Sequence, residues 1–146
     1  MADVQGVNYA ATLGSTPVGK VASNLNSGRF RVLHDTYEAS SAAAGTDVLL
    51  GKLKEGAVIH DWTVLSDDLG TSVTFQLATR DDDSDATENT FSQALDVASA
   101  ASVNRPAAAD IDELPLSVDE DVTVIGKIAG GTATGTVKVT IVYSVD

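Results

Sequence analysis

The residues in this 146-residue chain whose types and spacing could do chemistry are few, and the sharpest group is acidic. Asp81, Asp83 and Asp85 alternate within one polar stretch, and alternating carboxylates open the calcium loop of an EF-hand. That loop also requires Gly at its sixth position and Glu at its twelfth, where this chain has Ala86 and Ser92. The EF-hand is therefore excluded. We interpret the stretch as a solvated acidic loop, and a weak cation site of another kind stays open.

Nucleophilic catalysis finds no support in the sequence. The chain has two histidines, His34 and His60, and no cysteine, which excludes disulfides, thiolate metal sites and Cys nucleophiles. His60 is followed by Asp61, but neighbouring residues of a strand point to opposite faces and cannot form a pair. No Gly-x-Ser-x-Gly elbow is present. We therefore expect no enzyme and no metal or cofactor.

The glycines and the tryptophan have structural explanations. Gly130, Gly131 and Gly135 lack the Gly-Lys-Ser/Thr ending of a phosphate loop and suit a hairpin turn. Trp62 lies in a predicted strand, where a core position is more common than a sugar platform. Only 5% of the residues are aromatic, which argues against a carbohydrate-binding face.

Composition and charge argue against nucleic acid and membranes as partners. The formal net charge is −12, so binding to nucleic acid, which depends on clustered Lys and Arg, is not expected. No apolar run approaches the ~20 residues that span a bilayer, and no membrane association is expected. The opening residues lack the basic and apolar regions of a signal peptide. We expect a soluble protein made inside a cell.

The elements that would position any site are short strands. Period-2 alternation and turn signals predict strands over 29–38, 46–53, 57–66 and 72–78, with 111–118 as an edge strand because it contains Pro115. Phe30, Val32, His34 and Thr36 share one face of the first. Residues 87–101 are ambiguous between a short helix carrying Phe91, Leu95 and Ala98 and a loop.

The chain is organised around residues 122–145, for which we predict a closing hairpin. In its second run one set of apolar residues falls on one face and marks the sandwich interior. That set is Val137, Val139, Ile141, Tyr143 and Val145. Lys138, Thr140 and Ser144 fall on the other face, with Val142 as the exception.

These patterns predict an all-β fold: an antiparallel β-sandwich, jelly-roll-like, with an extended N-terminal arm. The predicted domains are an arm over 1–28 and a single sandwich over 29–146. The arm is rich in small and polar residues and shows no sustained period. It is either a frayed terminus or a segment that orders against a neighbouring subunit.

Several phrases resemble a family of small virion structural proteins of tailed bacteriophages. These are Gly6-Val-Asn-Tyr9, Gly28-Arg-Phe-Arg-Val-Leu-His-Asp-Thr-Tyr-Glu-Ala39, Leu53-Lys-Glu-Gly-Ala-Val-Ile59, Ser66-Asp-Asp-Leu-Gly70 and Val124-Ile-Gly-Lys-Ile-Ala-Gly-Gly-Thr-Ala-Thr-Gly-Thr-Val137. They span most of the chain, although residues 87–110 contribute none.

The resemblance is to capsid decoration, or cement, proteins, which implies a β-sandwich on the outer capsid surface. It further implies a major capsid protein as partner, a homo-oligomer with a trimer favoured, synthesis in the bacterial host cytoplasm and location in the virion. Such a protein stabilises the shell by bridging capsid subunits. Interface candidates are Val4, Val7, Asn8 and Tyr9 of the arm, by strand addition to a neighbour. The alternative is an adhesion or binding module associated with a phage tail or fibre.

Overall fold

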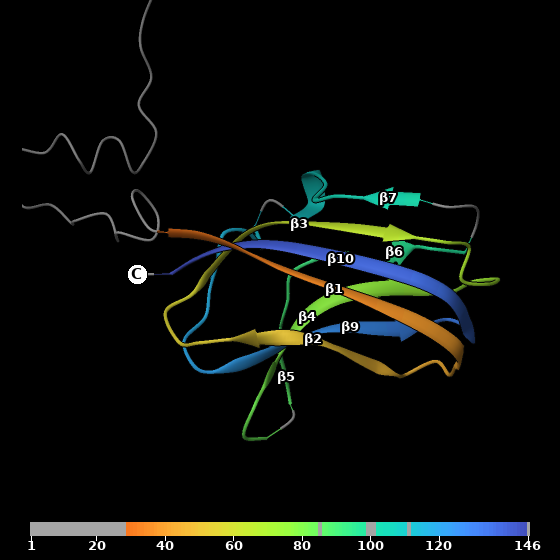
Figure 1. The fold of residues 1–146 in the computed structure, drawn as a ribbon, viewed down its shortest axis with the longest axis horizontal. Helices are drawn as coiled ribbons and strands as arrows, with labels where there is room; N and C mark the ends of the chain where they lie inside the picture. The colour runs from red at the N-terminus through yellow and green to blue at the C-terminus, as the bar shows by residue number, and fades with distance from the viewer. Residues whose placement is uncertain (1–28, 85, 99–101, 111, 146) are drawn as a thin grey trace, which may run out of the picture.

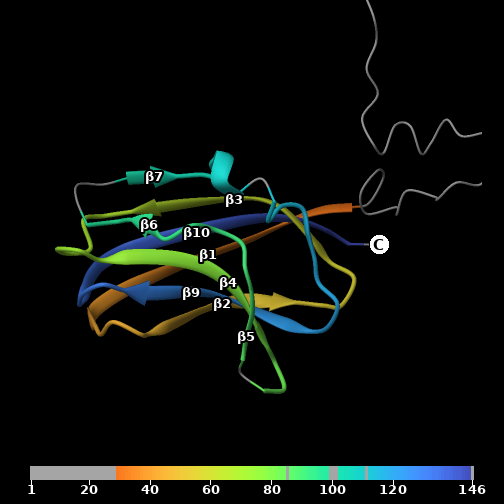
Figure 2. The same cartoon turned by 180° about the vertical axis from the view of Figure 1, so that it is seen from behind.

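A computed structural model describes residues 29–84, 86–98, 102–110 and 112–145 of the protein, and these form two packed antiparallel sheets (Figures 1 and 2). Sheet A has the order β1 (Arg29–Ala42), β10 (Ala133–Val145), β3 (Val58–Ser66) and β7 (Ser102–Asn104), with β8 (Leu116–Ser117) also paired to β3. Sheet B has the order β2 (Asp47–Leu53), β9 (Val122–Ala129), β4 (Thr74–Asp81) and β5 (Thr87–Thr90), with β6 (Leu95–Asp96) also paired to β4. The predicted all-β antiparallel sandwich is confirmed.

The core lies between the sheets and follows the alternation in the sequence. From β10, Val137, Val139 and Ile141 are buried as predicted. From β4, Phe75 and Leu77 face them and are also fully buried. Trp62 of β3 is fully buried, as a core tryptophan would be. One apolar side chain per two residues from each strand is therefore enough to fill the space between the two layers.

The predicted closing hairpin is wrong. β9 pairs with β2 and β4 in sheet B, whereas β10 pairs with β1 and β3 in sheet A, so the glycine-rich segment crosses between the layers. Gly130 has a φ of +80°, and a Cβ there would lie 2.0 Å from the carbonyl oxygen of Ser72. Thr134 donates its N–H to the carbonyl of Leu69 at 3.0 Å. The glycines thus serve a turn, but the turn packs against the β3–β4 loop instead of closing a two-stranded ribbon.

The pairing of β1 with β10 and of β2 with β9 is nested along the chain. β1 is an edge strand, and its register with β10 runs from Arg29 opposite Val145 to Ala42 opposite Ala133. Leu33 of β1 points across to sheet B, where a Cβ on Gly51 would lie 2.5 Å from its Cδ1. The two layers therefore touch closely beneath the edge strand.

The ambiguous segment after residue 86 contains no helix in its described part. It forms β5 and β6 with loops between them, and Phe91, Leu95 and Val97 are buried in the core. In the described part of the predicted edge strand, Leu116 and Ser117 pair with β3 and Val118 exchanges backbone hydrogen bonds with Gly56 and Ala57, so pairing begins directly after Pro115. The one helix of the described residues is η1 (Ala108–Asp110). None of their helices is long and apolar enough to cross a membrane.

Candidate interaction surface

The interface residues expected from the sequence, Val4, Val7, Asn8 and Tyr9, lie outside the described residues. The whole expected arm, 1–28, does so as well. It joins the sandwich at Arg29, the first residue of the edge strand β1. The arm interface therefore stays a prediction, and the sites below belong to the sandwich.

Within the acidic stretch, Asp81 binds groups of its own turn. Asp81 accepts the hydroxyl of Ser84 at 2.6 Å and the N–H of Asp83 at 2.8 Å. These two hydrogen bonds, the Ser84 hydroxyl first, lower the pKa of Asp81. No group of three or more His, Asp or Glu residues in the described ranges is arranged to hold a metal ion.

Ionic contacts tie the neighbouring loops together. Asp82 accepts the hydroxyl of Thr123 and the ammonium of Lys52, the latter at 2.9 Å, and these contacts lower the pKa of Asp82. Asp121 accepts Lys54 at 2.7 Å, which lowers the pKa of Asp121 and raises that of Lys54. These loops join β2 to β3, β4 to β5 and β8 to β9, so the contacts fasten one end of the sandwich.

The two histidines each bind a hydroxyl across to β10. His60 Nε2 lies 2.7 Å from Ser144 Oγ, and His34 Nδ1 lies 3.0 Å from Thr140 Oγ1. Ser144 is fully buried, so its hydroxyl is closed to a substrate. A bulge lies next to it in β3: Val142 is opposite Asp61 and Tyr143 is opposite Ile59, which leaves His60 as the extra residue, hydrogen-bonded to Ser144. The sequence placed Ser144 on the outer face, where the register with Phe30 puts it, but alternation alone did not reveal that it is buried there.

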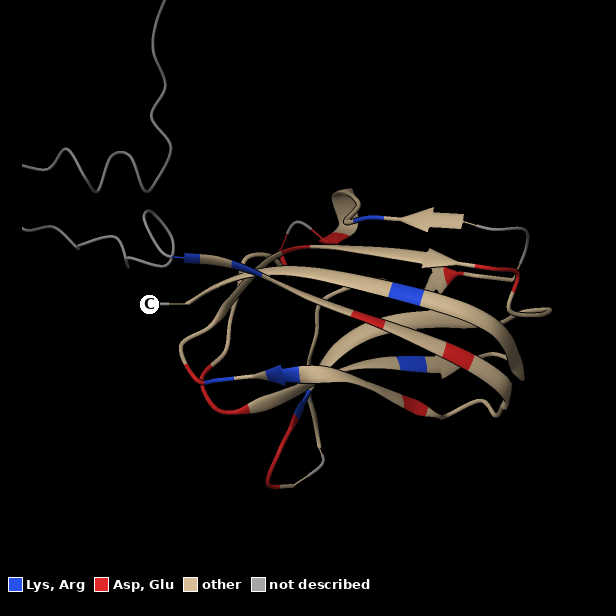
Figure 3. Ribbon diagram, viewed as in Figure 1, with Lys and Arg blue, Asp and Glu red and all other residues tan. Residues whose placement is uncertain are grey.

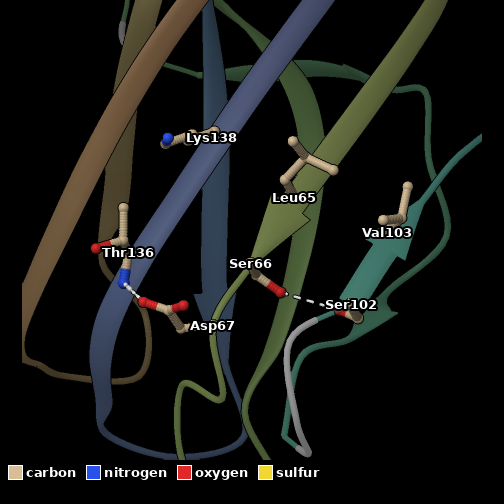
Figure 4. A pocket seen from close by; sticks show the side chains of 7 residues that line it. All are labelled: Leu65, Ser66, Asp67, Ser102, Val103, Thr136 and Lys138. Atoms are coloured by element: carbon tan, nitrogen blue, oxygen red, sulfur yellow. Dashed lines mark hydrogen bonds between the residues drawn. The ribbon is translucent and has the colours of Figure 1, made fainter.

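Sheet A carries an open groove on its outer face, about 460 Å³ in volume, between β10, β3 and β7. Figure 4 shows the side chains that line it, among which Leu65 and Val103 stand next to each other and Lys138 lies across the groove. Asp67 accepts the N–H of Thr136 at 3.1 Å, and the hydroxyls of Ser66 and Ser102 are 3.0 Å apart. The groove is lined by polar residues and by two large apolar side chains, Leu65 and Val103, which are exposed.

Exposed apolar side chains concentrate on the same face. Of the five large hydrophobic residues exposed in the described part, Phe30 (66%), Val32 (63%), Leu65 (42%) and Val103 (62%) belong to the outer face of sheet A. The fifth, Leu49 (55%), lies on sheet B. Sequence analysis grouped Phe30 and Val32 on one face of a strand but assigned no role to that face. The exposed large hydrophobic side chains of the described residues thus lie mostly on one face of one sheet.

Comparison with solved structures shows where this fold occurs. A chain of the capsid of Ralstonia phage GP4 superimposes with a TM-score of 0.59 at 24% identity, covering 94% of both chains. A chain of the capsid asymmetric unit of cyanophage Pam1 superimposes with a TM-score of 0.60 at 21% identity, covering 92% of this chain and 99% of the other. The protein has the fold of these two phage capsid chains. No protein-family model and no curated protein matches the sequence.

Proposed function

We propose that the protein is a bacteriophage capsid decoration, or cement, protein that binds the outer capsid surface and bridges capsid subunits. The observation that carries the proposal is the near-complete, two-way coverage of the similarity to chains of two phage capsids. A fold shared over the full length of both chains indicates a self-standing particle component of the same size. The proposed location is the virion, after synthesis in the host cytoplasm.

The proposed partner is the major capsid protein, and the proposed assembly is a homotrimer. In such an assembly each copy can bind weakly, because linked copies raise one another's effective concentration. The arm residues Val4, Val7, Asn8 and Tyr9 are proposed to contact a neighbouring subunit, by strand addition to a free sheet edge such as that of β1. The protein is proposed to act mechanically and not as an enzyme.

The adhesion alternative depends on exposed aromatic side chains or a metal site. Phe30 is the one aromatic among the exposed large hydrophobics of the described residues. A glycan platform normally stacks sugars on several such rings, so decoration of the shell is the better supported function.

The test uses shells assembled from the major capsid protein of the same phage without this protein. The full-length chain should co-sediment with the shells and raise the temperature at which they break. Its oligomeric state, measured by light scattering, should be a trimer. A chain that neither binds the shells nor changes their rupture temperature would refute the proposal, and binding to a glycan array would favour the alternative.

A further inference from the structure

The outer face of sheet A has apolar residues at both ends and polar residues between them. At one end, Phe30 and Val32 of β1 lie beside Ser144 and Val142 of β10. At the other, Leu65 of β3 is opposite Val103 of β7. The middle is polar, with His34 hydrogen-bonded to Thr140.

Phe30 is held in place although it is exposed. Its ring centroid lies 5.2 Å from that of His60, with the planes tilted by 60°. His60 is in turn fixed by its 2.7 Å hydrogen bond to the buried Ser144. An aromatic side chain whose orientation is already set loses less conformational entropy on binding, which makes Phe30 suited to be an anchor.

The outer face of sheet B is closed by its own contacts. Ile125 is fully buried there, between Leu49 and Ala78 on the neighbouring strands. Arg80 is 3.9 Å from Asp47, and Lys127 donates to Thr87 at 3.0 Å. The cations Arg80 and Lys127 of this face thus contact groups of the same sheet, and Leu49 is its one exposed large hydrophobic side chain among the described residues.

Both sheets carry charged residues of both signs (Figure 3), but the ion pairs are on one of them. The three ion pairs of the described ranges all lie on sheet B and its loops. Arg29, Arg31 and Lys138 of sheet A take part in none of them, while Glu38 and Asp61 are exposed on the same sheet. Arg29 and Arg31 alternate with Phe30 and Val32 and point to the other face of β1. In a chain of net charge −12, the cation that shares the outer face with the apolar residues is Lys138, opposite Leu65.

We propose that the outer face of sheet A is the surface that docks on the shell, with Phe30 and the Leu65–Val103 pair as its two apolar anchors. The inference rests on the proposed function and names the surface that carries it out. The partner it fits is a capsid-protein surface that presents apolar side chains for the two anchors and a carboxylate for Lys138 in the groove, which is opposite Leu65.

The area of this face agrees with an oligomer in which several linked copies bind the shell together. The two anchors are six residues apart along β10, from Ser144 to Lys138, or roughly 20 Å at ~3.3 Å per residue. Four strands at ~4.8 Å give a similar width. The area of about 400 Å² is half of the ~800 Å² that one partner buries in a standard interface. One copy would bind weakly, and linked copies would bind firmly.

A second copy is a poorer occupant of this face. In a cyclic trimer each contact joins two different patches of the chain. Outside sheet A, the described residues offer one exposed large hydrophobic side chain, Leu49. A neighbouring copy in a ring therefore has little apolar surface to set against Phe30 and Val103, which leaves the shell as the partner.

The test compares three full-length variants. Phe30→Ser with Val103→Ser removes both anchors, Lys138→Glu reverses the charge in the groove, and Leu49→Ser is the matched control on sheet B. All four positions are exposed, so folding should survive and is checked by the Trp62 fluorescence. Co-sedimentation with shells that lack the protein gives affinity, and light scattering gives the oligomeric state.

The double variant should lose at least about tenfold in affinity for the shells. Lys138→Glu should lose less affinity, and Leu49→Ser should bind like the wild type. All three variants should keep the oligomeric state of the wild type. Wild-type binding by the double variant would overturn the inference and leave the proposed function intact. Dissociation of the double variant into monomers would also overturn it, because the face would then join copies. Failure of the wild-type chain to bind shells would refute the proposed function itself.

Discussion

Gly126 of β9 leaves the space that the ring of Phe75 on β4 occupies: a Cβ at residue 126 would lie 2.0 Å from Cζ of that ring. Both residues are buried inside sheet B, on the face that meets sheet A. The absence of a side chain at Gly126 therefore leaves the space into which Phe75, the largest side chain of β4, packs. Strand glycines of this kind mark a close approach and not a turn.

Gly126→Ala should destabilise the fold, because the methyl group forces the Phe75 ring out of its position. Overpacking of this kind costs about 1–3 kcal/mol in the free energy of unfolding. Urea unfolding measures it. Gly45→Ala is the comparison, since a Cβ there meets nothing within 4 Å and only its φ of +92° is unfavourable. Equal midpoints for Gly126→Ala and the wild type would contradict the packing described here.

Asp110 should be the most sensitive buried acid. It is 3% exposed, and its carboxylate accepts the N–H of Gln93 at 3.0 Å and that of Ala107 at 2.8 Å. Asp110→Ala leaves both donors without their acceptor and should cost about 2–3 kcal/mol, read from denaturant unfolding. Asp110→Asn keeps one acceptor oxygen and should lose less. If the two variants were equally stable, the two hydrogen bonds would not be the cause.

Acid stability should depend on Thr123. Its hydroxyl is the largest cause of the lowered pKa of Asp82, so the folded pKa lies below the ordinary ~3.9 of an unfolded Asp. The stability from this carboxylate is complete above the unfolded pKa and is lost as pH falls through the folded one. Thr123→Val should raise the pKa of Asp82, measured by NMR, and should reduce the loss of Tm between pH 5 and pH 2.

Thr74→Val is the matched control for this experiment, because Thr74 lies on the same sheet and has no hydrogen bond to a carboxylate in the described part. It should leave the pKa of Asp82 and the acid-induced change in Tm as in the wild type. An unchanged pKa of Asp82 in Thr123→Val would mean that Lys52 alone lowers it.

The two histidine contacts should differ in strength. Ser144→Ala removes a buried hydroxyl from His60 and should cost about 1–2 kcal/mol, whereas Thr140→Val removes an exposed one from His34 and should cost under about 0.5 kcal/mol. Thermal unfolding measures both changes in stability. If Thr140→Val cost more than Ser144→Ala, burial would not be what makes the His60–Ser144 hydrogen bond the stronger of the two.

The sequence was informative where structure is local. Alternation in β10 predicted which of its residues face the core, because a strand buries every second side chain. It did not predict that β9 and β10 separate into different sheets, because glycines serve a hairpin and an inter-sheet crossing equally well. One partner of β10 is β1, which is adjacent in the sheet but about a hundred residues away in the sequence, and such pairing leaves no local trace.

The candidate surface could not be predicted from the sequence, for a related reason. The alternation of Phe30 and Val32 is the same whether that face is buried or exposed. Arg29 and Arg31 beside them were the available hint, since charges at both flanks suit an exposed end of a strand. The role of Gly126 was hidden too, because nothing in the sequence shows which ring packs on it.

The position of β10 between β1 and β3 also governs when the protein can form. Arg29 pairs with Val145, so β1 leaves the ribosome long before its partner is made. Sheet A cannot close until β10 has been synthesised, and such distant pairing makes folding slow. An interrupted chain that ends before β10 would expose the unpaired edges of β1 and β3. Only chains that have been translated through β10 can therefore present the complete outer face of sheet A.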